Sequence, residues 1–250
     1  MGQNVFPSRY ESEKIEAILQ KFDPIDASFL YNASIHGMLS KENLTPIRVG
    51  EIIKAVPTSR RTYLLEVLGL HIAKEIEDPA GLTPYLEQMK MKERKYFYKG
   101  FTFRTVFKGK WSLKEQQESL SGMDLSYRQW FYFNLGRLLG DPSNEKGWQE
   151  ARKIAAELNA KEKKWVYRGI GEAVGGYWVW GRAPYRKAMD LIAVPVDDYS
   201  EIFRGMGWTL REAFAEDQLR ALDWIGRLPR EFQLQAVSGL RAFEQWRKIN

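Results

Sequence analysis

The chain has 250 residues, of which 44% are hydrophobic and 28% charged, a composition typical of a folded globular protein. It contains no cysteine, which excludes disulfide bonds, thiolate metal ligands and a cysteine nucleophile. The longest uncharged run, residues 27–40, is too short to cross a bilayer as a helix. The formal net charge is +6 at pH 7, with the excess gathered in one short segment described below.

Residues 1–24 are predicted to form an N-terminal segment or capping helix ahead of a helical-repeat domain over residues 25–250. The first part of this segment, residues 1–14, contains no apolar stretch of the kind that a signal peptide needs. We therefore expect a cytoplasmic protein.

A five-residue pattern recurs along the chain, with an aromatic or aliphatic residue at its first position and a small residue at its third position, its fifth position or both. The clearest copies are 167–171, with the sequence YRGIG, and 203–207, with the sequence FRGMG. In chain order the copies cover residues 33–37, 65–69, 98–102, 132–136, 167–171, 203–207 and 234–238, at intervals of 31 to 36 residues. Such even spacing indicates a structural repeat.

A second segment with helical periodicity follows most copies of the pattern. In residues 145–158, for example, apolar side chains recur at steps of three and four, which is the period of an α-helix. The other second segments are residues 44–56, 82–91, 185–194 and 218–228. The chain is therefore predicted to be all-α, a solenoid of about seven helix–turn–helix repeats of 31–36 residues.

The sequence of residues 97–107 is compatible with either a β-strand or a helix. Their sequence, FYKGFTFRTVF, places Phe101, Phe103, Thr105 and Phe107 on one side of a possible β-strand. The register of the five-residue pattern favours a helix instead, and we follow the register.

The glycines of the pattern need a physical reason, because each one costs about 1 kcal/mol relative to alanine inside a helix. Without a Cβ atom, the backbone of a neighbouring helix can approach that position closely. The glycines concerned are Gly69, Gly100, Gly136, Gly169, Gly171, Gly205 and Gly207. The aromatic residues at the first position, Tyr98, Tyr132, Tyr167 and Phe203, are then expected to pack between successive repeats.

A helical hairpin of about 34 residues with a glycine in its first helix resembles the tetratricopeptide and Sel1-like repeats. The unit that carries the resemblance best runs from Gly171 through Ala183 and Ala188 to Pro195. The resemblance lies in the period and the glycine pattern. It implies a right-handed superhelix with a concave groove lined by the first helix of each repeat.

The candidate catalytic residues of the sequence do not combine into a recognisable active site. His71 and Glu75 are four residues apart, but no second histidine completes a zinc-binding helix motif. Asp197, Asp198 and Glu201 are similar to the aspartate-rich Mg²⁺ site of terpenoid synthases, although acids at the start of a helix are also favoured by the helix dipole. We expect no cofactor, no metal and no catalysis, and keep a metal-dependent all-α enzyme using these three acids as an alternative.

If the first helices line a groove, the cationic residues beside their glycines are candidates for binding a partner. Guanidinium and ammonium groups would hold the carboxylates of an acidic protein or peptide, and aromatic rings would stack on it. The predicted binding residues are Lys99, Phe103, Arg104, Arg137, Arg168, Arg204 and Trp208. We accordingly expect a scaffold that mediates protein–protein interaction, unless these side chains merely cover apolar surface.

Single-stranded nucleic acid is the alternative partner. Between Lys90 and Lys110 lie eight basic residues and one acid, Glu93, so this segment carries 8 − 1 = +7 and the rest of the chain 6 − 7 = −1. The cations are interleaved with Tyr96, Phe97, Tyr98, Phe101 and Phe103, as in proteins that stack bases and contact phosphates. An affinity that falls steeply with salt would favour this alternative over a protein partner.

Overall fold

The computed structural model describes residues 17, 21, 31, 34–76, 79–108, 118, 120–140, 153–154, 156–181, 199–214 and 217–247. Over these residues every regular element is a helix and no β-strand is present. The predicted all-α class is therefore confirmed. Residues 97–107 lie inside the helix α6 (Met91–Lys108), so the strand alternative was wrong for that stretch.

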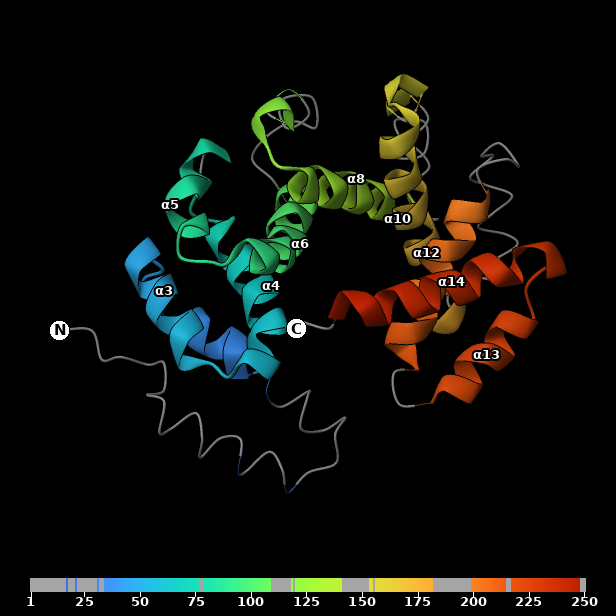
Figure 1. Ribbon diagram of the computed structural model, residues 1–250, viewed down its shortest axis with the longest axis horizontal. Coiled ribbons are helices and arrows are strands. Elements are labelled where there is room, and N and C mark those ends of the chain that lie inside the picture. The colour runs from blue at the N-terminus through green and yellow to red at the C-terminus, as the bar shows by residue number, and fades with distance from the viewer. Residues whose placement is uncertain are drawn as a thin grey trace. The chain divides into compact units, whose positions relative to one another are not determined.

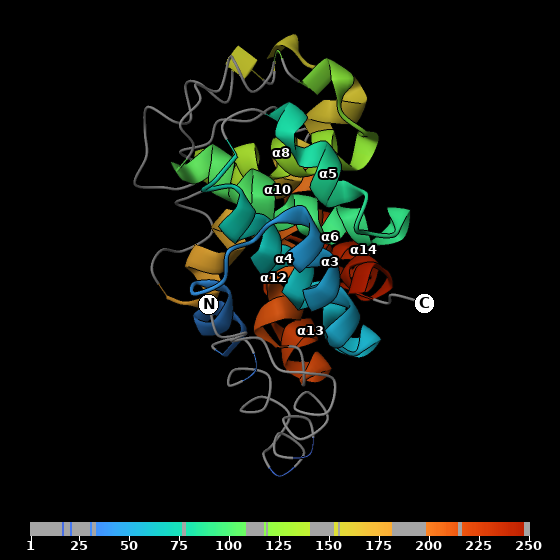
Figure 2. The ribbon, with the colours of Figure 1, turned by 90° about the vertical axis from the view of Figure 1, so that its left-hand side faces the viewer.

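The chain divides into two compact units, Met1–Tyr127 and Arg128–Lys248. The helices of each unit can be followed by their labels in Figures 1 and 2. The first unit contains α3 (Pro46–Ala55), α4 (Arg61–Ile72), α5 (Thr83–Leu86) and α6, with 3₁₀ turns at Thr58–Arg60, Pro79–Leu82 and Leu120–Gly122. The second contains most of α8 (Leu125–Leu139), then α10 (Ala160–Val179), α12 (Tyr199–Ala213), α13 (Gln218–Gly226) and α14 (Arg230–Arg247).

Helix starts follow local side-chain chemistry. The Asn159 side chain accepts hydrogen bonds from the backbone N–H groups of Lys161 and Glu162 and so caps α10. The Asp217 carboxylate accepts from the Arg220 N–H at 2.9 Å and caps α13 in the same way. Helix α3 begins with a proline directly after its capping Thr45, where a missing N–H costs nothing.

Each predicted copy of the five-residue pattern that the structure describes lies in a helix. Residues 34–39 are helical, and the later copies lie in α4, α6, α8, α10, α12 and α14, which we call the pattern helices. Of the predicted second helices, 44–56 and 218–228 are found as α3 and α13, whereas 82–91 contains only the four-residue α5. Segment 185–194 and most of 145–158 lie outside the described residues.

Consecutive pattern helices cross where glycines remove the side chains. A Cβ atom added to Gly100 of α6 would lie 1.8 Å from the carbonyl oxygen of Glu66 in α4, and one on Gly69 would lie 2.2 Å from the carbonyl oxygen of Phe97. The same reciprocal contact recurs in the second unit. There the glycine pairs are Gly136 with Gly169, Gly171 with Gly205, and Gly207 with Gly239. Close helix crossing is thus the reason for the glycine pattern.

The crossings also change the interpretation of the first and last copies of the pattern. Gly239 contacts the carbonyl oxygen of Arg204 just as Gly205 contacts that of Arg168, so the last copy covers residues 237–241 and not 234–238. Its spacing from the copy before it is then 241 − 207 = 34 residues. At the other end, a Cβ on Gly37 would meet nothing within 4 Å, so this glycine marks no close crossing.

The aromatic residues at the first pattern position are buried, as predicted. Tyr98, Tyr132, Tyr167 and Phe203 are all less than 9% exposed. The Tyr98 ring meets that of Tyr127 edge to face, with centroids 5.3 Å apart, and its hydroxyl donates to the Asp124 carboxylate at 2.7 Å. Tyr98 of α6 therefore joins this helix to the start of α8 within the core.

Candidate functional site

The predicted binding residues Lys99, Phe103 and Arg104 lie on α6 in the first unit. The Lys99 ammonium forms an ion pair with Glu66 of α4, with Nζ 2.8 Å from Oε2. Phe103 is half-buried and stacks on Phe107, with ring centroids 4.6 Å apart. Arg104 is half-buried and lies near enough to His71 to lower the pKa of that imidazole. Only part of each side chain is therefore available to a partner.

Arg137, on α8 in the second unit, also pairs with a glutamate of an adjacent pattern helix. Its Nε lies 2.6 Å from Oε2 of Glu172 on α10. Glu66 and Glu172 occupy pattern positions equivalent to those of Lys99 and Arg137. The sequence therefore held a signal for these ion pairs, namely opposite charges at equivalent positions of adjacent repeats.

Arg168 and Arg204 share a single carboxylate. Nε of Arg168 on α10 lies 2.5 Å from Oε2 of Glu201 on α12, and a terminal nitrogen of Arg204 lies 3.0 Å from Oε1 of the same glutamate. The Arg168 guanidinium also covers the Trp165 ring at 4.7 Å from its centroid. Two guanidiniums against one carboxylate leave this group, the Glu201 cluster, with a net charge of +1.

The surplus charge of the Glu201 cluster belongs to Arg204. The Arg204 side chain is 30% exposed, compared with 12% for Arg168. Its Nε atom is buried and makes no hydrogen bond with any residue that the structure describes. An arginine has five N–H donors, so Arg204 retains donors for a further acceptor.

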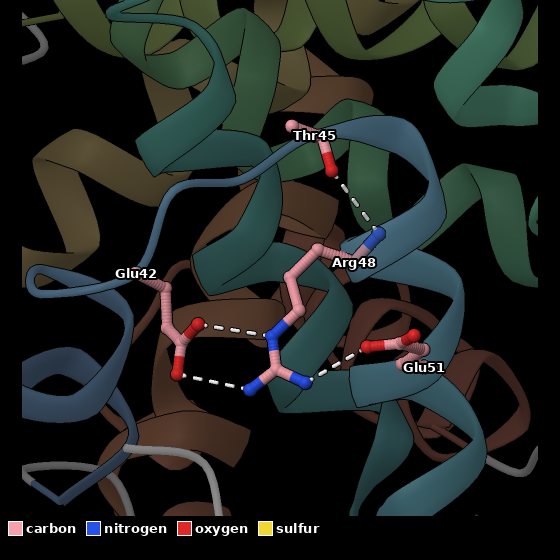
Figure 3. A network of polar contacts seen from close by, with 4 residues as sticks. All are labelled: Glu42, Thr45, Arg48 and Glu51. Atoms are coloured by element: carbon pink, nitrogen blue, oxygen red, sulfur yellow. Dashed lines mark hydrogen bonds and ion pairs between the residues drawn. The ribbon is translucent and has the colours of Figure 1, made fainter. Parts of the chain in front are cut away.

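Arg48 is an arginine of this protein whose three guanidinium nitrogens all donate to carboxylates. Its Nε and one terminal nitrogen donate to both oxygens of Glu42, at 2.9 and 3.1 Å, and its other terminal nitrogen donates to Glu51 at 2.9 Å (Figure 3). The hydrogen bond to Glu42 is the main reason that the pKa of Arg48 lies above its ordinary value. Arg48 thus contacts two carboxylates, whereas Arg204 contacts one carboxylate, which it shares with Arg168.

Trp208, the seventh predicted binding residue, lies in the core. It is 4% exposed, and its ring packs against Phe133 of α8 and Trp165 of α10, at centroid distances of 5.1 and 6.3 Å. A partner would reach the Trp208 ring only by displacing these neighbours.

In the described part of the basic segment, residues 90–108, cationic side chains are exposed or half-buried, whereas most of the aromatic side chains are buried. Lys90 and Lys92 are exposed at the start of α6, whereas its acid, Glu93, is 2% exposed and accepts a hydrogen bond from the Lys90 N–H at 2.9 Å. Four of the five aromatic residues proposed to stack on bases are buried, namely Tyr96, Phe97, Tyr98 and Phe101. Phe103 alone among the five is partly accessible.

The alternative metal site is not assembled in the described part of the chain. Asp197 and Asp198 lie outside the described residues, and Glu201 is engaged by the two arginines. Among the residues that the structure describes, no group of three or more histidine, cysteine or acidic side chains is arranged to hold a metal ion. No described helix is both long and apolar enough to cross a membrane.

Comparisons of the chain with protein-family models, with curated proteins and with solved structures find no match. The resemblance to tetratricopeptide and Sel1-like repeats therefore stays a prediction from the period and the glycine pattern.

Proposed function

We propose that this protein is a non-catalytic helical-repeat scaffold that holds an acidic segment of a partner protein, with Arg204 making the principal contact. The observation that carries the proposal is the sharing of one carboxylate, that of Glu201, between Arg168 and Arg204. A carboxylate from a partner would complete the set of acceptors around Arg204, as Glu42 and Glu51 do for Arg48.

The chemistry of the cluster favours a carboxylate ligand. The guanidinium presents parallel N–H donors that match the two oxygens of a carboxylate, which gives a stronger and more directional contact than a lone ammonium. Arg168 holds Glu201 on one side and is itself held by the Trp165 face, so Glu201 is fixed before the partner arrives. Little conformational entropy is then lost on binding.

In this proposal the pattern helices form a superhelical solenoid like that of the tetratricopeptide proteins, and the Glu201 cluster lies on the surface that receives the partner. The other predicted cations contribute less, because Lys99 is paired with Glu66 and Arg137 with Glu172. Arg137, which lies in the same unit as the Glu201 cluster, adds a modest attraction for an acidic segment.

An array of synthetic acidic peptides, probed with the purified chain, tests the proposal. Arg204→Glu is expected to abolish binding to the peptides that the unaltered chain selects. Arg227→Glu is the control, because Arg227 also pairs with a single carboxylate, that of Asp223, but lies at the C-terminal cap of α13. Equal binding by the unaltered chain and Arg204→Glu would contradict the proposal. Preferential binding of an oligothymidine, lost at high salt, would favour the nucleic-acid alternative.

A further inference from the structure

The two histidines of the chain lie side by side. His36 and His71 are 71 − 36 = 35 residues apart in sequence, yet their ring centroids are 5.7 Å apart with the planes inclined at 45°. His36 belongs to the helical residues 34–39 and His71 to the last turn of α4, both in the first unit. We call these two side chains the imidazole pair. Both are half-buried, so a small ligand can reach them.

The ring nitrogens of the imidazole pair have no hydrogen-bond partner among the described residues. Tyr63 meets His36 edge to face, with ring centroids 6.1 Å apart. Neither ring has a nitrogen that is both buried and without a partner, so the unpaired ring nitrogens are in contact with solvent. A ligand from solution can therefore reach them.

The surroundings of both imidazoles favour the neutral form over the protonated one. Burial is the largest cause that lowers the pKa of each, and for His71, with Lys74, His36 and Arg104 acting in the same direction, the pKa falls to about 4. Glu66 acts in the opposite direction on His36. A neutral imidazole has one nitrogen with a free lone pair and is the form that binds metal ions.

We propose that His36 and His71 together bind one divalent transition-metal ion of the class that prefers imidazole, such as Zn²⁺. Imidazole nitrogens bind Zn²⁺ at about 2.1 Å, so two rings on one ion have centroids roughly 5 to 6.4 Å apart, depending on the angle at the metal. The observed 5.7 Å falls within that range. This inference does not rest on the proposed partner-binding function.

The site would be open and of modest affinity. Two protein ligands leave the remaining coordination positions of the ion to water. Lys74 and Arg104 repel a cation near His71, whereas Glu66 attracts one near His36. A hard ion such as Mg²⁺, which prefers oxygen ligands, would gain little from the imidazole pair. Removing the charge of Lys74 is therefore expected to strengthen Zn²⁺ binding severalfold.

Calorimetric titration of the full chain with Zn²⁺, carried out without a histidine tag at about pH 7.5, tests the inference. We expect one Zn²⁺ per chain, no binding of Mg²⁺, and at least a tenfold loss of affinity in His36→Ala and in His71→Ala. Lys74→Gln should raise the affinity. Circular dichroism and melting temperature show whether each variant is folded.

A second measurement needs no substitution. Because the chain has only two histidines, its long-range ¹H–¹⁵N spectrum contains signals from just two imidazoles. Zn²⁺ should shift the nitrogen signals of both rings with the same titration midpoint. The proposal is overturned if Zn²⁺ up to about 1 mM shifts neither ring or only one of them, or if either alanine variant folds and binds Zn²⁺ as tightly as the unaltered chain.

Discussion

The carbonyl oxygen of Arg168 in α10 lies against Gly205 of α12, only 2.0 Å from the place where a Cβ atom would be. The contact is reciprocal, because Gly171 of α10 has the carbonyl oxygen of Ile202 at 1.8 Å from its own Cβ position. Backbones this close make Cα–H···O contacts of the kind found at tight helix crossings. The same pairing joins α4 to α6, α8 to α10 and α12 to α14.

Gly205→Ala is expected to lower the free energy of unfolding by about 3 kcal/mol, because the new methyl group must displace the backbone of α10. Gly37→Ala is the matched control: it also lies in a helix, but its Cβ would meet nothing within 4 Å. That variant should be unchanged or more stable by up to about 1 kcal/mol. Chemical denaturation measures both. Equal effects of the two substitutions would contradict our account of the crossings.

Glu201→Gln should destabilise the fold by about 2 kcal/mol, because it leaves the charges of Arg168 and Arg204 facing each other without a carboxylate. Arg204→Ala should cost much less, since Arg168 keeps its ion pair with Glu201. Urea denaturation at low salt measures the difference. A larger loss in Arg204→Ala than in Glu201→Gln would mean that Arg204 serves the fold and holds no surplus charge.

Trp208→Ala is expected to lower stability by about 3 to 5 kcal/mol, the usual cost of removing a large aromatic side chain from a core. The empty space would lie between Phe133 and Trp165, which come from two other helices. Thermal denaturation followed by circular dichroism measures the loss. Unchanged stability with weakened peptide binding would instead place Trp208 at the partner surface.

Alkaline pH is expected to destabilise the fold, in part because buried tyrosines ionise more readily in the unfolded chain. Burial raises the pKa of Tyr127 far above its ordinary value and that of Tyr132 to about 12. A folded-state pKa above the unfolded one gives stability that is complete below about pH 10 and is lost as the pH rises further. Tyr127→Phe has no hydroxyl there to ionise. Its stability should therefore fall less than that of the unaltered chain between about pH 8 and 11.5, as measured by urea denaturation at each pH. An equal fall would show that ionisation of Tyr127 is not coupled to unfolding.

Much of the helical architecture was accessible from the sequence, because glycine inside a helix is costly and its regular recurrence requires a packing reason. The last copy of the pattern contains a single glycine, Gly239, and is therefore hard to align with the others. The sequence predicts this copy at residues 234–238, three residues before its position in the structure. Among consecutive pattern helices from α4 to α14, only α6 and α8 lack a reciprocal glycine pair between them, because Thr102 and Asn134 occupy those positions.

The sequence by itself determined that this chain is helical, where its helices approach one another, and which aromatic rings are buried. These follow from periodicity and from the local cost of glycine. Only the tertiary structure decided that Glu66, Glu172 and Glu201 neutralise most of the predicted binding cations, that Arg204 keeps a surplus, and that His36 meets His71. Such pairings join residues some 33 to 35 positions apart, and the angle and depth of each helix crossing select them.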